Sequence, residues 1–82
     1  MQSTASPPTF DAELDARGLV CPEPLMLVRN RLRKMQSGEV LYVTATDPST
    51  LRDFTSLCRF MGHRLLSHTS DAGVWRFWIQ RA

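Results

Sequence analysis

A single cysteine, Cys21, stands where the sequence changes from an extended pattern to a helical one. It is preceded by Arg17-Gly18-Leu19-Val20 and followed by Pro22-Glu23-Pro24. A thiol at a helix N-terminus lies near free backbone N–H groups and the positive end of the helix dipole, and both favour the thiolate, the form that attacks sulfur or binds metal. The arrangement predicts thiol chemistry at Cys21. The alternative is a small, inert, buried side chain.

The two prolines that follow Cys21 suit the start of a helix. If Cys21 is the N-cap residue, Pro22 occupies the first helical position and Pro24 the third, where neither needs an intrahelical N–H bond. The amide of Glu23 is then the main donor near the sulfur. The Glu23 carboxylate opposes thiolate formation, whereas Arg17 and the helix dipole assist it. We therefore expect a modestly lowered pKa for Cys21.

Two strands and two helices should position this cysteine. Apolar and acidic residues alternate over residues 10–16, which predicts a strand that Gly18 follows as a break. Residues 22–35 have helical periodicity, with the apolar stripe Leu25, Val28, Leu32 and Met35. Residues 39–46 are rich in β-branched side chains and predict a second strand.

Asp47 and Pro48 then predict an N-cap and a first helical residue. The apolar face of this second helix is Leu51, Phe54, Cys58 and Met61, and Gly62 should end it.

The remaining residues predict a hairpin, with strands at 64–70 and 74–81 joined by Asp71-Ala72-Gly73. Along the last strand Trp75, Phe77 and Ile79 share the core face, and Trp78 lies on the other face as a cover or a second contact surface.

The order βαβαββ predicts an α/β (α+β) two-layer sandwich, with two helices on one face of a mixed four-stranded sheet. We expect one domain over residues 10–82. The first nine residues lack the charged and apolar regions of a signal peptide. We expect them to form a flexible tail.

Composition restricts the class of protein. With 82 residues and 43% hydrophobic content, the chain can form one modest core. No apolar run is long enough to cross a bilayer, so no membrane role is expected. Two widely spaced cysteines suit a reduced, cytoplasmic protein, with Cys58 as a core thiol. The net charge of +2 permits nucleic-acid binding without arguing for it. The spacing of His63, His68 and the cysteines does not favour a zinc site, and no cofactor or metal is expected.

The stretch Leu14-Asp15-Ala16-Arg17-Gly18-Leu19-Val20-Cys21-Pro22-Glu23-Pro24 resembles the signature of the TusA/SirA family of small sulfur carriers, with Cys-Pro-x-Pro as its most specific part. Residues 35–39, the Thr46-Asp47-Pro48 turn and residues 58–63 are also similar. The resemblance extends over residues 11–81. It implies that Cys21 takes sulfur as a persulfide from a cysteine desulfurase, a pyridoxal phosphate enzyme.

The resemblance also implies that the sulfur passes to downstream relay proteins and ends as 2-thiouridine at the tRNA wobble position, so that tRNA is served only indirectly. Gly18, Pro22, Glu23 and Pro24 would position the thiol. The desulfurase would contact Met26, Arg29, Asp47 and Phe60. Such a carrier forms a covalent intermediate, and whether it counts as an enzyme is left open.

Two other functions remain open at this point. A nucleic-acid-binding or regulatory module could use the basic residues of the first helix, Arg29, Arg31, Arg33 and Lys34. The same carrier chemistry could instead serve sulfur oxidation or molybdoenzyme maturation. Salt-sensitive RNA binding that survives Cys21→Ser would indicate the former. The identity of the partner proteins would indicate whether the carrier serves sulfur oxidation or molybdoenzyme maturation.

Overall fold

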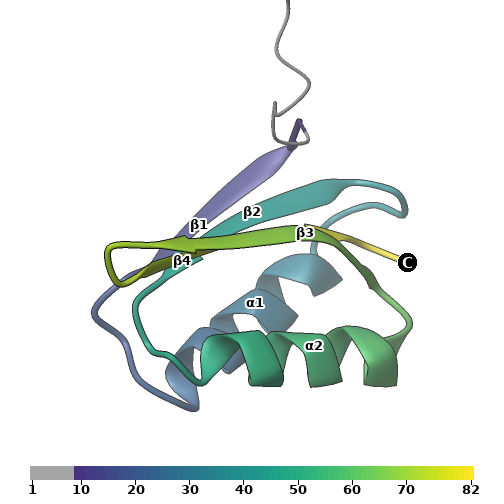
Figure 1. Ribbon diagram of the computed structural model, residues 1–82. Coiled ribbons are helices and arrows are strands. Elements are labelled where there is room, and N and C mark those ends of the chain that lie inside the picture. Colours follow the sequence, from purple (N-terminus) through teal and green to yellow (C-terminus); the bar gives the residue numbers. More distant parts are fainter. Residues whose placement is uncertain (1–8) are drawn as a thin grey trace, which may run out of the picture.

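The computed structural model describes residues 9–82, and the expected tail over residues 1–9 lies, but for Thr9, outside them. The elements are β1 (Ala12–Ala16), α1 (Glu23–Arg33), β2 (Val40–Ala45), α2 (Thr50–Met61), β3 (Arg64–Asp71) and β4 (Val74–Gln80). Both helices cover one face of the sheet (Figure 1). The predicted order and the two-layer α+β sandwich are confirmed.

The sheet has the strand order β1-β2-β4-β3, in which β1 and β2 are parallel and the other pairs are antiparallel. The parallel pair is joined through α1, as the long connection between parallel strands requires. The hairpin turn between β3 and β4 places Ala72 and Gly73 at positive φ, 53° and 82°, which matches the twist of the two strands.

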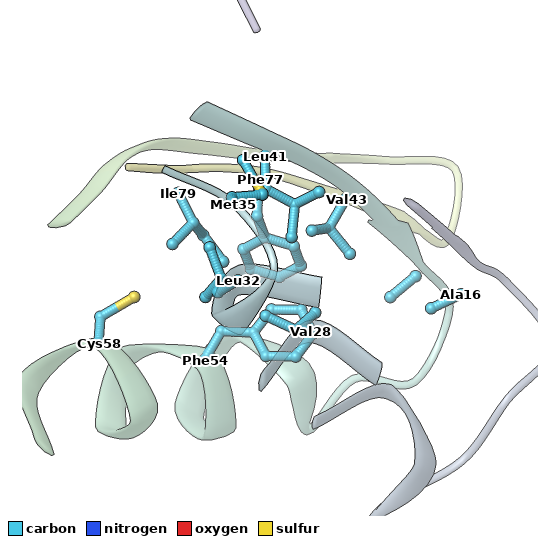
Figure 2. Close-up of a cluster of buried hydrophobic side chains, with 11 residues drawn as sticks. Ala16, Val28, Leu32, Met35, Leu41, Val43, Phe54, Cys58, Phe77 and Ile79 are labelled. Carbon is cyan, nitrogen blue, oxygen red and sulfur yellow. The ribbon is translucent and has the colours of Figure 1, made fainter. Parts of the chain in front are cut away.

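The core lies between the helices and the sheet (Figure 2). At its centre the rings of Phe54 on α2 and Phe77 on β4 pack edge to face, with centroids 4.7 Å apart and an interplanar angle of 76°. Figure 2 shows these two rings beside Val28 and Leu32 of α1. Cys58 is buried on the same side of α2, where the sequence placed it.

The helix boundaries differ from the prediction at their N-termini. The N-cap residue of α1 is Pro22, one position later than expected, and that of α2 is Ser49, two positions after Asp47. The later start of α2 arises because Asp47 and Pro48 form a turn, in which the Thr50 N–H bonds to the Asp47 carbonyl at 3.0 Å. Gly62 ends α2 in the left-handed conformation, as predicted.

Two apolar residues also lie elsewhere than expected. Pro24 is fully buried at the start of α1, whereas Leu25 is only half-buried. Met61, expected on the buried face of α2, is 38% exposed and is the last residue of the helix. Both differences give the outer sides of the helices an apolar surface.

The opposite face of the sheet carries an aromatic stack. Trp78 packs on Tyr42 and Tyr42 on Phe10, each with ring centroids 5.0 Å apart. Trp78 is only 5% exposed, and its Nε1–H has no hydrogen-bond partner among the described residues. Trp78 therefore covers this face of the sheet, one of the two placements that its position in the strand allows.

Candidate functional site

Cys21 lies in the loop between β1 and α1, which we call the motif loop (residues 17–22). Gly18 begins the turn with a φ of +83°, a conformation that side chains disfavour, and its N–H donates to Thr46 Oγ1 at 2.8 Å. The Glu23 N–H donates to the Val20 carbonyl at 2.9 Å, and the Cys21–Pro22 bond is cis. Cys21 is exposed at the end of this turn.

Pro22, Glu23 and Pro24 join the motif loop to α1. Pro24 is fully buried, so it anchors the first turn of α1 in the core, while Pro22 and Glu23 are exposed. The Glu23 amide is occupied by the Val20 carbonyl at 2.9 Å. The prediction that this amide is the main donor to the Cys21 sulfur is therefore wrong.

Asp47 ties the motif loop to the segment before α2. Its Oδ2 accepts the Cys21 backbone N–H at 2.7 Å, and its Oδ1 accepts the Ser49 N–H and hydroxyl at 3.0 and 2.9 Å. These bonds lower the pKa of Asp47, those from the Ser49 and Cys21 amides being the largest causes. Asp47 was expected as a helix N-cap and as a partner contact. It is not the N-cap but lies before the helix, where it accepts the Cys21 backbone N–H, and its partner contact stays a prediction.

The surroundings of the thiol are acidic. The Asp53 carboxylate is the largest cause of a raised Cys21 pKa, followed by desolvation and by the charge of Asp47, and Arg52 partly offsets them. The expectation of a lowered pKa is therefore wrong. Arg17, expected to assist the thiolate, instead forms a bidentate pair with Asp15, with both N–O distances 2.9 Å.

A groove runs between the outer sides of α1 and α2. A hollow of about 740 Å³ is lined by Leu25, Asp53, Ser56, Leu57, Arg59 and Phe60. A smaller one of about 200 Å³ adjoins it and is lined by Leu25, Met26, Arg29, Leu57, Phe60 and Met61. We call the two together the α1–α2 groove. Its surface is mostly apolar, and Phe60, Met26 and Met61 are 87%, 48% and 38% exposed.

The structure brings together three of the four residues expected to contact a partner. Met26, Arg29 and Phe60 line the α1–α2 groove, whereas Asp47 is not among its lining residues and bonds to the backbone of the motif loop. Sequence reasoning missed Asp53 and Leu57, which line the same groove. The spacing of residues 53, 57 and 60 on one face of a helix is the signal that could have indicated them.

Cys58 and His63, the other candidate residues, lie outside the motif loop. Burial raises the pKa of Cys58 to about 11. His63 Nδ1 accepts the Ala82 N–H at 2.9 Å, which gives this histidine a structural contact near the end of β4. Within residues 9–82, no three His, Cys, Asp or Glu side chains gather to hold a metal ion. None of the helices in this range has the length and apolar content to span a bilayer.

Known proteins share both the sequence and the fold. The family model described as "Sulfurtransferase TusA" matches residues 12–81. Proteins named "Sulfur carrier protein TusA" are 49% identical in Pseudomonas putida strain GB-1 (89% of this chain, 91% of the relative) and 47% identical in Pseudomonas syringae pv. syringae strain B728a (89% and 87%). A SirA-like protein from Desulfitobacterium hafniense has the same fold, with a TM-score of 0.77 at 24% identity over 85% of this chain and 96% of that one. A family match that runs from β1 to beyond β4, together with relatives of nearly equal length, shows that the chain belongs to the TusA family.

Proposed function

We propose that this chain is a sulfur carrier that holds transferable sulfur as a persulfide on Cys21. The observation that carries the proposal is an exposed cysteine in the Cys-Pro-x-Pro turn of a TusA-family chain. The relatives named above are called sulfur carriers. Cys58 is unsuited to the task, because it is buried and its pKa is about 11.

The transfer step is an exchange between sulfur atoms. The Cys21 thiolate attacks the terminal sulfur of a persulfide on the donor, a new S–S bond forms, and the donor's own S–S bond breaks. The donor cysteine leaves as a thiolate and takes up the proton that Cys21 released. No external oxidant is needed, because the sulfur keeps its oxidation state as it moves. The same step in reverse sense delivers the sulfur to an acceptor thiol.

We propose a cysteine desulfurase as the donor and the α1–α2 groove as its docking surface. Exposed Met26 and Phe60 offer apolar contacts, and Arg29 and Arg59 place positive charge along the groove. Aromatic, methionine and arginine side chains are the types enriched in protein interfaces. Downstream, we propose that cytoplasmic relay proteins carry the sulfur onward, and that it becomes the 2-thio group of 2-thiouridine at the tRNA wobble position. The carrier itself then does not bind tRNA.

Intact mass measurement tests the carrier function. Incubation with a cysteine desulfurase and free cysteine should add about 32 Da, which a reducing agent removes, as expected of a persulfide. Cys21→Ser should abolish the gain, and Cys58→Ser should retain it. A wild-type protein that gains no sulfur from several active desulfurases would contradict the proposal and favour a binding module. The destination is tested separately by 2-thiouridine content in cells that carry only the Cys21→Ser variant.

A further inference from the structure

The motif loop is bonded to a second segment, the connection between β2 and α2 (residues 46–49). Strands β1 and β2 are parallel and pair at their last residues, Ala16 and Ala45, so the chain leaves both strands at the same edge of the sheet. Figure 1 shows the two connections running together from that edge toward the helices. The parallel pairing therefore places Asp47 beside Cys21, although 26 positions separate them in the sequence.

Two side chains of this connection accept hydrogen bonds from the backbone of the motif loop. Thr46 Oγ1 accepts the Gly18 N–H at 2.8 Å, near the start of the loop. Asp47 Oδ2 accepts the Cys21 N–H at 2.7 Å, near its end. The second bond is short because its acceptor is a carboxylate, which makes the bond charge-assisted. The loop is therefore bonded to the same neighbouring segment on both sides of its turn.

The Asp47 carboxylate is itself oriented by the residue that begins α2. Its Oδ1 accepts the Ser49 N–H at 3.0 Å and the Ser49 hydroxyl at 2.9 Å, while Oδ2 accepts the Cys21 amide. The bonds from the Ser49 and Cys21 amides lower the pKa of Asp47, so it is a charged acceptor at neutral pH. Ser49 is the N-cap residue of α2, so the carboxylate is connected to a regular element and not only to other loop residues.

From these contacts we infer that Thr46 and Asp47 are positioning residues for sulfur transfer: they hold the motif loop in one conformation, which orients the Cys21 sulfur toward a docked partner. The inference rests on the carrier function proposed above. In that function both reacting sulfur atoms belong to folded proteins, so the docked complex must bring them together in an aligned geometry. A loop that exchanged among several conformations would present the sulfur correctly for only part of the time.

Thr46→Val tests the inference without altering any charge. Valine is nearly the same size as threonine, but it cannot accept the Gly18 N–H. The rate of sulfur loading at saturating cysteine desulfurase should fall about ten-fold. The affinity for the desulfurase should stay within about two-fold of the wild type, because Thr46 does not line the α1–α2 groove. Thr46→Ser keeps the hydroxyl and should restore the rate.

Two substitutions of Asp47 separate positioning from a direct contact with the partner. Asp47→Asn keeps an oxygen that can accept the Cys21 N–H, whereas Asp47→Ala removes it. Positioning predicts that Asp47→Ala slows loading at saturation by about ten-fold and that Asp47→Asn slows it much less. A partner contact through the charge alone predicts weaker binding in both variants and an unchanged rate at saturation. Asp47 is also a cause of the raised Cys21 pKa, after Asp53 and desolvation, so loss of its charge alone would speed transfer and not slow it.

Two measurements need no sulfur donor. Amide hydrogen exchange at Gly18 and Cys21 should be slower in the native wild type than in the chain unfolded in urea. Thr46→Val should speed exchange at Gly18 by about five-fold or more, because its N–H loses the acceptor. Iodoacetamide is small and can approach an exposed thiol from any open direction. It should therefore alkylate Cys21 at nearly the same rate in Thr46→Val and in the wild type.

The results that would overturn the inference are distinct from those that would refute the carrier function. A Thr46→Val variant that loads sulfur at the wild-type rate would overturn it, as would amides of Gly18 and Cys21 that exchange as fast in the native wild type as in the unfolded chain. Equal slowing of loading and alkylation would also overturn it, because the reactivity of the thiol and not its orientation would then have changed. A wild type that gains no sulfur would refute the carrier function and its use of the loop, whereas slow exchange lost in Thr46→Val would still establish that the loop is held.

Discussion

Phe60 should matter for binding and hardly at all for folding. Its side chain is 87% exposed, although a phenylalanine that is fully buried contributes about 1.5–3 kcal/mol. The small part already covered is therefore worth about 0.2–0.4 kcal/mol of folding free energy. The exposed 87% would be worth about 1.3–2.6 kcal/mol if a partner buried it completely. Phe60→Ala should accordingly weaken desulfurase binding by roughly 10- to 80-fold.

Two measurements on the same variant check this reasoning. Urea unfolding should give Phe60→Ala a free energy of unfolding within about 0.5 kcal/mol of the wild type, as expected for a surface position. Titration calorimetry with the desulfurase should show the loss of affinity. Leu66→Ala is a matched control, because Leu66 is 39% exposed on β3 and does not line the groove.

Any of three results would refute this prediction. Unchanged affinity for Phe60→Ala would show that the desulfurase does not bury this ring. A loss of more than about 1 kcal/mol in unfolding free energy would show that the ring packs in the free protein, contrary to its 87% exposure in the structure. An equal loss of affinity in Leu66→Ala would show that apolar surface in general, and not the groove, sets the binding.

Three further predictions concern folding and reactivity. Because the pKa of Cys58 is about 11, its thiolate fraction at pH 8 is about 0.001, and iodoacetamide should modify only Cys21 in the native protein; modification of both before unfolding would contradict this. Gly18→Ala should cost about 1–2 kcal/mol of unfolding free energy, since an added Cβ meets open space and only the φ of +83° is unfavourable; an unchanged urea midpoint would disprove it. Burial and Arg81 lower the pKa of His63, so the unfolded chain binds a proton first and stability should fall as pH drops below about 6.5. His63→Asn keeps an acceptor for the Ala82 N–H at 2.9 Å without titrating and should flatten that slope; an unchanged pH profile would rule His63 out.

Local patterns were enough to predict the architecture. Alternation in β1, β-branched residues in β2 and the helical stripe through Val28 and Leu32 each depend on neighbours a few residues away, and the structure contains all of these elements. The order of the elements then left few ways to cover the sheet, and the helices lie on one face. The exposed Cys21 at the turn before α1 follows from the same local reading.

The electrostatics of the site could not be predicted in this way. A helix N-terminus beside Cys21 argues for a lower thiol pKa, but the direction is set by Asp53 and Asp47, which lie far from Cys21 in the sequence. Arg17 failed as an assisting charge because Asp15, two residues earlier, binds it with both carboxylate oxygens. Local sequence rules predict the turn and the helix dipole at Cys21. The charged residues around the sulfur come from distant parts of the chain, so they follow only from the fold.

The site separates the control of the sulfur from the recognition of a partner. Asp47 accepts the Cys21 backbone N–H from just before α2, and Asp53, in the first turn of α2, is the largest cause of the raised Cys21 pKa. The side chains of Met26 and Phe60 instead present exposed apolar surface along the groove. Substitutions of the second kind should therefore change the affinity for a donor with little change in the rate once bound. Substitutions of Asp53 should change the rate of sulfur transfer, because the rate depends on the thiolate fraction at Cys21.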